Sequence, residues 1–357
     1  MSLEFASFLL SIAGVSLAAM ALFIQARDSA DRKKNLLKPL ENGIKPLLLG
    51  LSLALVCAVI WAIANVSLKH VSLGGADMFL FVGAMMAFAG ALGISAAISV
   101  RKSSGFPTLS MNSFEIGLAF LGNFGNAIFF ILAIAHISSS ELIILGKTNP
   151  IFLALFLFYF LGERLTRASF LSVFVVFIGV VLLVSDPQLQ EFRPRNSSFV
   201  SYAFALLAGI SFSVFSFALH LSNRRETDVR ILDNLFTLAI VNLLTGISLI
   251  VFAFLFIGVS LSVVDSTFVL WTIFNAIRLA FLYLVYKICM KYVGPVLASV
   301  LVMLEVPFTM VLEQRWVGLS IDVYLVVGAV LISAGIVSMI IDAPSNLRRD
   351  KAADERT

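Results

Sequence analysis

Charged side chains are scarce in this sequence, and their scarcity decides the class of protein. Asp, Glu, Lys and Arg make up 13% of the 357 residues, while 60% are hydrophobic. Soluble domains carry about 25% charged residues and about 45–50% apolar ones. A chain with so little charge cannot cover a soluble globule with polar surface. We therefore expect a helical membrane protein that crosses the bilayer several times.

Cysteine is also rare, and other chemical motifs are missing. The two cysteines, Cys57 and Cys289, both lie in apolar runs, which excludes a disulfide framework. The sequence contains no zinc-ligand spacing, no glycine-rich phosphate loop and no Ser/His/Asp grouping. The net charge of +4 does not indicate nucleic-acid binding, because the basic residues flank apolar runs. We expect no metal, no cofactor and no nucleic-acid partner.

The apolar runs predict eleven transmembrane helices, since each is long enough to cross a bilayer. The expected spans are Phe5–Gln25, Pro46–Leu68, Met78–Val100, Phe114–Ala135, Leu142–Leu161, Phe170–Val184, Phe199–Leu221, Ile231–Val259, Thr267–Lys287, Gly294–Val311 and Ile321–Ile341.

The distribution of Lys and Arg supports this count of helices. With residues 27–45 placed in the cytoplasm, 19 basic residues fall on the cytoplasmic side and four on the other. Such a bias is the rule for membrane proteins and places the N-terminus outside and the C-terminal tail inside. The basic residues of 27–45 are interpreted as a topology anchor, with contact to lipid headgroups as the alternative.

A weak internal duplication relates the two halves of the chain. Pro150 and Pro307 are 157 positions apart, and Gly179 and Gly335 are 156 apart. Five helices on each side of an outer loop predict two five-helix units in an inverted repeat. The expected organisation is an extra N-terminal transmembrane helix (1–26), a basic linker (27–45), a first repeat (46–185), a polar loop (186–198), a second repeat (199–341) and a charged tail (342–357).

Several of these residues resemble a known family. Pro150-Ile151-Phe152, then Leu161-Gly162-Glu163-Arg164-Leu165 and Gly179 are similar to the EamA-like branch of the drug/metabolite transporter superfamily. The resemblance implies a ten-helix transporter of small metabolites. It also implies that Gly162, Glu163 and Arg164 form a turn between two helices. In the second half Gly318-Leu319-Ser320 replaces this turn, and Glu305-Val306-Pro307 stands where the family often has Glu-Pro.

Three ionisable residues lie within expected spans and mark the candidate site. They are Lys147, Arg278 and Glu305. Charges inside a bilayer are costly and usually functional. We expect them to form a substrate site between the halves, together with Asn123, Asn126, Asn149 and Asn275. One positive charge in excess favours an anionic group on the substrate. The alternative is structural: Glu305 pairs with Arg278, and Lys147 extends to the membrane surface.

Two further roles are hypotheses, one for Trp61 and Asn65 and one for Glu305. Trp61 and Asn65, on the first helix of the repeat, resemble a family pattern, and Trp61 is either a platform for substrate or an ordinary packed aromatic. Glu305 is a candidate for proton coupling, since burial favours its neutral form and a nearby arginine opposes this.

The expected function is secondary transport of a small organic metabolite, such as an amino acid or organic acid, by alternating access. Sugar phosphates or nucleotide-linked substrates are the alternative within transport. A membrane enzyme or a scaffold is the alternative outside it, but no Asp or His lies near the middle of a span, where an enzyme would need one. The expected location is the inner membrane, with lipid as a partner and a monomer or homodimer as the assembly.

Overall fold

The computed structural model describes residues 44–73, 77–100, 106–134, 142, 145–146, 148–163, 166–184, 199–226, 230–259, 266–317 and parts of 327–338. The chain divides into two compact units, Met1–Leu49 and Gly50–Thr357, and the contacts given below belong to the second. The expected first helix, nearly all of the basic linker, the loop 186–198 and the tail 342–357 lie outside the described residues.

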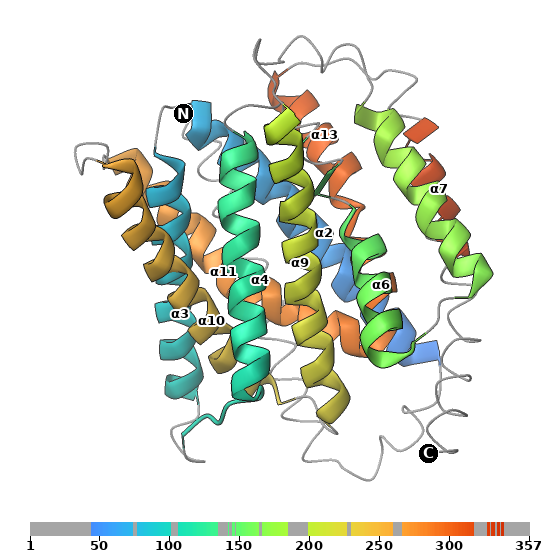
Figure 1. Cartoon of the computed structure of the whole chain (residues 1–357), viewed down its shortest axis with the longest axis horizontal. Helices are drawn as coiled ribbons and strands as arrows, with labels where there is room; N and C mark the ends of the chain where they lie inside the picture. The colour runs from blue at the N-terminus through green and yellow to red at the C-terminus, as the bar shows by residue number, and fades with distance from the viewer. Residues whose placement is uncertain are drawn as a thin grey trace. The chain divides into compact units, whose positions relative to one another are not determined.

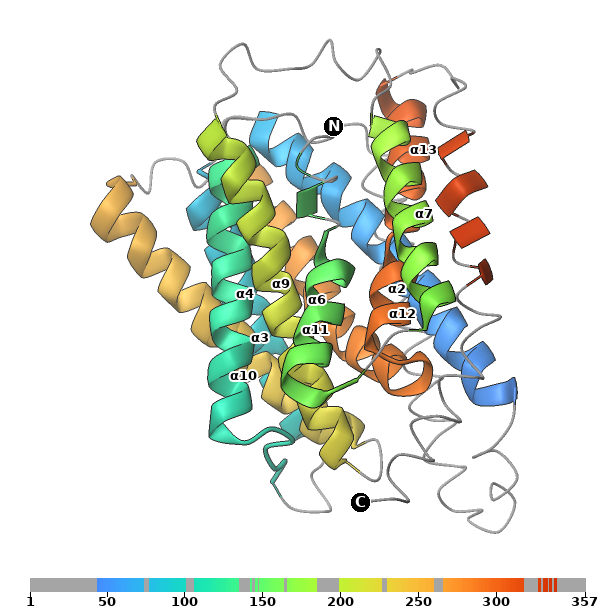
Figure 2. The same cartoon turned by 45° about the vertical axis from the view of Figure 1, so that its right-hand side comes forward.

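The described chain is helical throughout, as Figures 1 and 2 show. Its elements are α2 (Ile44–Leu73), α3 (Met78–Val100), α4 (Ser113–Ile134), α6 (Asn149–Leu161), α7 (Arg167–Val184), α9 (Phe199–Arg225), α10 (Ile231–Phe252), the π-helical turn η2 (Ala253–Ile257), α11 (Ser266–Val293), α12 (Pro295–Val302) and α13 (Glu305–Val317). Six helices, α2, α3, α4, α9, α10 and α11, are long and apolar enough to cross a membrane. The chain is therefore a multi-pass membrane protein of helical class.

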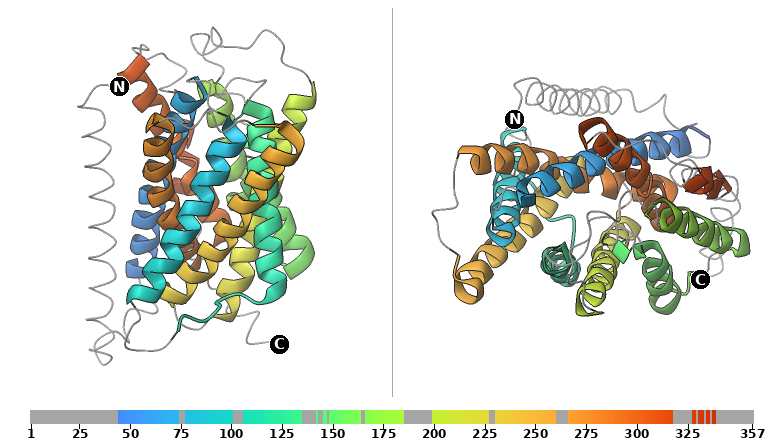
Figure 3. Two further views of the ribbon diagram at one scale, coloured as in Figure 1. Left: turned by 90° about the vertical axis from the view of Figure 1, so that its left-hand side faces the viewer. Right: turned by 90° about the horizontal axis from the view of Figure 1, so that it is seen from above.

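Two pairs of helices pack closely, and each pair joins the two expected halves. The first is α3 with α10, and the second is α4 with α9, which lie side by side in Figures 1 and 3. Glycine makes these approaches possible. A Cβ on Gly246 would lie 2.2 Å from the backbone nitrogen of Ala87, and one on Gly122 would lie 2.4 Å from that of Phe215. Small residues at such crossings let helices gain contacts without a hydrophobic driving force.

The contacts between α3 and α10 are reciprocal. A Cβ on Gly83 would lie 3.2 Å from the carbonyl oxygen of Gly246, and one on Gly90 would lie 2.6 Å from that of Ala239. Gly83 and Ala239 are 156 positions apart, as are Gly90 and Gly246. Each half thus presents equivalent positions to the other, as a two-fold relation between halves requires.

The same reciprocity recurs between α7 and residues 327–338. A Cβ on Gly179 would lie 2.8 Å from the carbonyl oxygen of Gly328, and one on Gly335 would lie 2.9 Å from that of Ser172. The spacing between equivalent positions is again 156 residues. The contacts agree with the expected duplication, whereas the complete ten-helix repeat stays a prediction.

The span expected as one helix at Gly294–Val311 is wrong, because the structure has two helices there, α12 and α13 (Figure 2). A turn at Met303 and Leu304 separates them, and Leu304 N–H donates at 3.1 Å to a carbonyl only three residues back. The cause lies four residues after Met303. Pro307 has no N–H to donate to the Met303 carbonyl, and its ring would collide with that oxygen in a continuous helix.

The expected span Leu142–Leu161 also does not run as one regular helix where it is described. Its second part, α6, begins at Asn149, directly after a turn at Thr148. Pro150 is the second residue of α6, a position where its missing N–H costs nothing. Both breaks fall near the middle of their spans, and both face the cavity described next.

Candidate functional site

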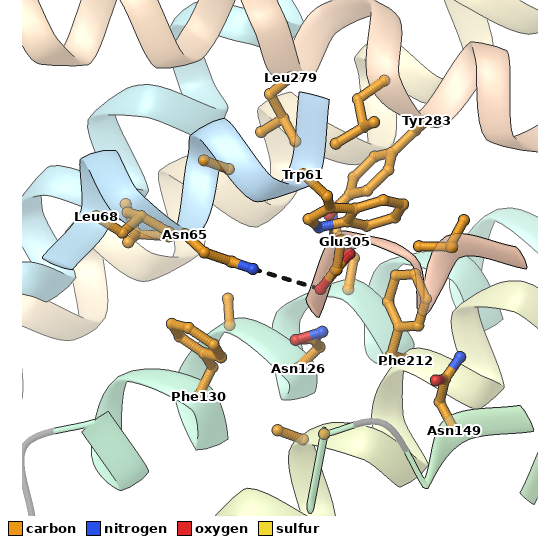
Figure 4. A pocket seen from close by; sticks show the side chains of 18 of the residues that line it. Trp61, Asn65, Leu68, Asn126, Phe130, Asn149, Phe212, Leu279, Tyr283 and Glu305 are labelled. Carbon is orange, nitrogen blue, oxygen red and sulfur yellow. Dashed lines mark hydrogen bonds between the residues drawn. The ribbon is translucent and has the colours of Figure 1, made fainter. Parts of the chain in front are cut away.

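A cavity of about 160 Å³ lies between the helices of the second unit. Residues from α2, α3, α4, α6, α9, α11 and α12 line it, together with Glu305 at the start of α13. The polar lining includes four amides and two charges, which are Asn65, Asn123, Asn126, Asn149, Arg278 and Glu305. Figure 4 shows several of these side chains converging on the space. Six of the predicted polar site residues therefore meet at one cavity.

The two broken helices bring backbone and side-chain polar groups to this cavity. Asn149, the first residue of α6, and Glu305, the first residue of α13, both line it. They are 156 positions apart, the spacing of the duplication. A helix begins with unbonded N–H groups and a partial positive charge. Glu305 supplies a negative charge at the start of α13, whereas Asn149 supplies a neutral amide at the start of α6.

Glu305 is 3% exposed, so its carboxylate is almost completely removed from solvent. The side chain of Asn65, from α2, donates a hydrogen bond to Glu305 Oε1 at 3.4 Å, drawn as a dashed line in Figure 4. This bond connects the first and second expected halves across the cavity. Proton coupling through Glu305 stays a prediction.

Arg278 brings a buried hydrogen-bond donor to the cavity. Its Nε atom is buried, and it has no hydrogen-bond partner among the described residues. A buried donor without a partner costs about 1–3 kcal/mol. An acceptor on a bound molecule would remove this cost. Arg278 therefore marks the part of the cavity where a ligand oxygen is most favourable.

Two of the predicted asparagines are held by protein groups. Asn123 donates to Asn242 Oδ1 at 3.1 Å and accepts from Tyr283 OH at 3.0 Å, so its amide links α4 to α10 and α11. Asn275 does not line the cavity, since it donates to the Trp271 carbonyl at 3.0 Å and accepts from Ser67 Oγ at 2.9 Å. These contacts brace helices, and a role in substrate binding stays a prediction for both residues.

Trp61 lines the cavity and also packs against an aromatic group. Its ring centroid lies 5.5 Å from Phe212, 6.2 Å from Tyr283 and 5.7 Å from Tyr286. These distances are typical of aromatic pairs. Trp61 can therefore be a packed aromatic side chain and still face the cavity. Its use as a platform for substrate stays a prediction.

The turn after α6 has the geometry that its glycine requires. Gly162 has φ +70°, a conformation that other residues adopt at a cost, and its N–H caps α6 at the Phe158 carbonyl at 3.1 Å. Glu163 extends beyond the turn to α9, where it accepts from His220 at 3.1 Å and pairs with Arg224 at 3.3 Å. Lys147 and Arg164, the other two charged positions singled out in this half, lie outside the described residues.

Sequence reasoning missed a second polar cluster, centred on Lys287. Lys287 is 0% exposed, and its Nζ donates to Glu226 Oε1 at 2.7 Å, Asn234 Oδ1 at 2.5 Å, Ser222 Oγ at 2.8 Å and Ser110 Oγ at 3.3 Å. A lysine near a helix C-terminus is usually a solvated topology signal. The sequence around Lys287 does not show whether the side chain is solvated or buried, because its four acceptors come from distant positions in the chain.

Comparison with known families supports the resemblance found in the sequence. Residues 48–185 match the EamA-like transporter family. The resemblance noted from the sequence is thereby confirmed, and the match covers the first expected repeat. The EamA-like match, with the apolar helices, indicates a membrane transporter of the drug/metabolite type. It therefore favours a small-molecule substrate and a lipid environment, and it favours transport over enzymatic activity.

Comparison with solved structures supports the fold. A crystal structure titled only "Crystal structure of protein" superimposes with a TM-score of 0.66 at 19% identity, covering 82% of this chain and 98% of the other. In all, 29 chains of solved structures match. At this identity the likeness shows the fold alone. No curated protein matches the sequence.

Proposed function

We propose that the protein is a secondary active transporter that moves a small organic metabolite with an anionic group, such as an amino acid or organic acid, by alternating access. The observation that carries this proposal is the position of Arg278. It lines a central cavity with a buried Nε that has no partner among the described residues. A planar guanidinium matches a carboxylate better than any other side chain does.

The arrangement of the halves supports alternating access. The contacts between α3 and α10 relate positions 156 residues apart, and both broken helices begin their second parts at the cavity. Discontinuous helices at the interface of inverted repeats are a common site of substrate binding in transporters. In our proposal the repeats are residues 46–185 and 199–341, forming a ten-helix core with an extra helix at 1–26 in the inner membrane.

The size of the cavity favours a small substrate over a nucleotide-linked one. At about 160 Å³ it is comparable to an engineered cavity of about 150 Å³ that admits benzene. The charges on the described lining, Arg278 and Glu305, are of opposite sign. An amino acid, with a carboxylate for Arg278 and an ammonium for Glu305, suits both.

The test is a thermal-shift screen of purified full-length protein against amino acids, organic acids, sugar phosphates, amines and neutral sugars. A ligand that binds the folded state raises Tm by mass action. We expect stabilisation by amino acids or organic acids and its loss in Arg278→Gln. Arg224→Gln, which changes a half-exposed arginine outside the cavity lining, is the matched control and keeps the response. Stabilisation by amines or neutral sugars alone, or a full response in Arg278→Gln, contradicts the proposal.

A further inference from the structure

The Lys287 cluster ties together four segments at one end of the helices, the lower end in Figure 1. These are the segment 106–112 before α4, the end of α9, the start of α10 and the end of α11. Besides the four bonds of Lys287, the Asp233 carboxylate accepts from Thr108 N–H at 2.9 Å, and Thr237 Oγ1 accepts from Ser110 N–H at 2.9 Å. The cluster thus joins the first half of the chain to the second by directional bonds.

An ion pair with a nearly buried carboxylate strengthens the same junction. Arg225, at the end of α9, pairs with Glu115 in the first turn of α4, and Glu115 is 3% exposed. All four ion pairs formed between described residues, those of Glu115, Glu163 (two) and Glu226, lie at this end of the molecule. We call it the Lys287 end, and we call the other end, where α9 begins, the opposite end.

Aromatic side chains of α9 and α11 lie in the sequence between or beside the cavity-lining residues and the residues of the cluster. Tyr286 lines the cavity and directly precedes Lys287 on α11. Its hydroxyl is bonded to Ser299 at 2.7 Å and to Ser216 at 3.2 Å. Phe215 is 0% exposed, and its ring centroid lies 4.7 Å from that of Tyr283. On α9, Ser222 of the cluster stands ten residues beyond Phe212 of the cavity, about 15 Å along the axis.

We propose that the Lys287 cluster is the gate at that end of the molecule: its bonds between the halves hold the cavity closed there, and substrate passage requires that they break. The inference rests on the proposed transport function. The gate needs a bistable junction between halves, and polar bonds provide one because water can replace them when the halves separate. Three acceptors of Lys287, Ser222, Glu226 and Asn234, belong to its own half, and Ser110 belongs to the first half. Lys287 therefore organises the second-half side of the junction, and the bonds of Asp233, Thr237 and Arg225 join that side to the first half.

The direction of the effect follows from the two-state arrangement. Removing Lys287 takes away its bond to Ser110 and the central donor of the second-half side of the junction, so in our proposal it destabilises the state closed at the Lys287 end more than the state open there. The population then shifts toward the state open at this end, which is closed at the opposite end. Accessibility of the cavity must therefore change in opposite senses at the two ends. General loosening of the fold would raise it at both.

The experiment uses a cysteine in the cavity and a membrane-impermeant methanethiosulfonate. Ala208, on α9, lines the cavity and becomes Ala208→Cys in a full-length background with Cys57→Ala and Cys289→Ala. Labelling rates are measured in vesicles of both orientations. Without further change, the cysteine is expected to react faster from the opposite end. Faster or equal labelling from the Lys287 end would overturn the assignment.

Three variants are then compared in this background: Lys287→Met, the charge-balanced pair Lys287→Met with Glu226→Gln, and the control Arg224→Met. We expect labelling from the Lys287 end to rise at least about tenfold in the first two, and labelling from the opposite end to fall. The control removes an ion pair between the halves at the same end, Arg224 with Glu163, but this pair is partly exposed and contributes little, so the starting rates are kept. A rise at both ends, or no change at either in both variants, overturns the gate.

Failure of the gate proposal can be distinguished from failure of the transport proposal. The labelling assay needs no substrate, whereas the thermal-shift screen needs no gate. A metabolite that stabilises the protein through Arg278, with no reciprocal change in labelling, leaves the transport site and removes the gate. Reciprocal labelling without stabilisation by amino acids or organic acids leaves the gate and removes the proposed substrate class.

Discussion

The Arg278 cavity and the Lys287 cluster place buried cations in opposite circumstances. Lys287 is fully buried and donates to four protein acceptors, one of them a carboxylate. Arg278 has a buried Nε with no partner among the described residues and lies beside open space. A buried cation whose bonds are complete serves the structure that completes them. One whose bonds are incomplete can gain a bond from a ligand, which is why the proposed function places the substrate at Arg278.

The largest expected effect is on the free energy of unfolding in Lys287→Met. The substitution leaves Glu226 without its cation, and breaking a buried pair costs about 3–5 kcal/mol. Thermal melting in detergent should show a large fall in Tm. Adding Glu226→Gln removes the uncompensated carboxylate, so the double variant should recover part of the loss. A single variant as stable as the wild type would erase the contrast with Arg278.

Arg278→Gln should have the converse signature. Loss of charge-assisted bonds to an anionic ligand costs about 1.5–3 kcal/mol, which weakens affinity about 10- to 100-fold. The Tm of the ligand-free protein should stay the same or rise, because an unpartnered donor has been removed. Isothermal titration with the stabilising metabolite and melting without it are the two measurements. A marked fall in Tm without ligand would assign Arg278 a structural role and break the comparison.

Helix packing provides a reference that involves no charge. A Cβ on Gly246 would meet the backbone of α3 at 2.2 Å, so Gly246→Ala should cost about 1–3 kcal/mol by forcing α3 and α10 apart. Gly117, on α4, has nothing within 4 Å of such a Cβ. Gly117→Ala should instead stabilise by up to about 1 kcal/mol, because glycine weakens a helix. Melting of both variants tests the α3–α10 contact; equal behaviour would contradict it.

The smallest effect on stability is expected for Glu163→Gln, which removes the carboxylate of a partly exposed ion pair. The carboxylate is 31% exposed and its partner Arg224 is 45% exposed. Pairs of this kind contribute below about 1 kcal/mol. Melting at low and high salt should show a small difference that salt reduces. A loss as large as that of Lys287→Met would show that burial is not what distinguishes the two ionic groups.

Some cavity-lining residues could be recognised from the sequence by their position alone, and their role in substrate binding stays a prediction. Arg278 and Glu305 were recognised because charges deep in an apolar run are costly wherever they lie. Both line the cavity, as do Asn126 and Asn149. Asn275 was chosen by the same reasoning, yet its amide is engaged by Ser67 and Trp271. Polarity within a span indicates that a group needs a partner, but it does not say whether protein or ligand provides it.

The helix break at Met303 and Leu304 shows that the sequence also leaves part of the fold undecided. Pro307 was noted as a family feature, but the segment Gly294–Val311 was expected as one span. A proline within a helix either kinks it or ends it, and the surrounding packing selects between these outcomes. The same holds at Thr148, where α6 begins just before Pro150 within a segment also expected as one span.

Composition by itself determined that this protein lies in a membrane, since a chain with 60% hydrophobic and 13% charged residues has no other stable environment. Its short motifs indicated a resemblance to the family whose model matches residues 48–185. Only the tertiary structure decided which buried cation is satisfied and which is not. The acceptors of Lys287 stand between 53 and 177 positions away in the chain. The cost of burying a charge is local, but its compensation depends on groups that only folding brings together.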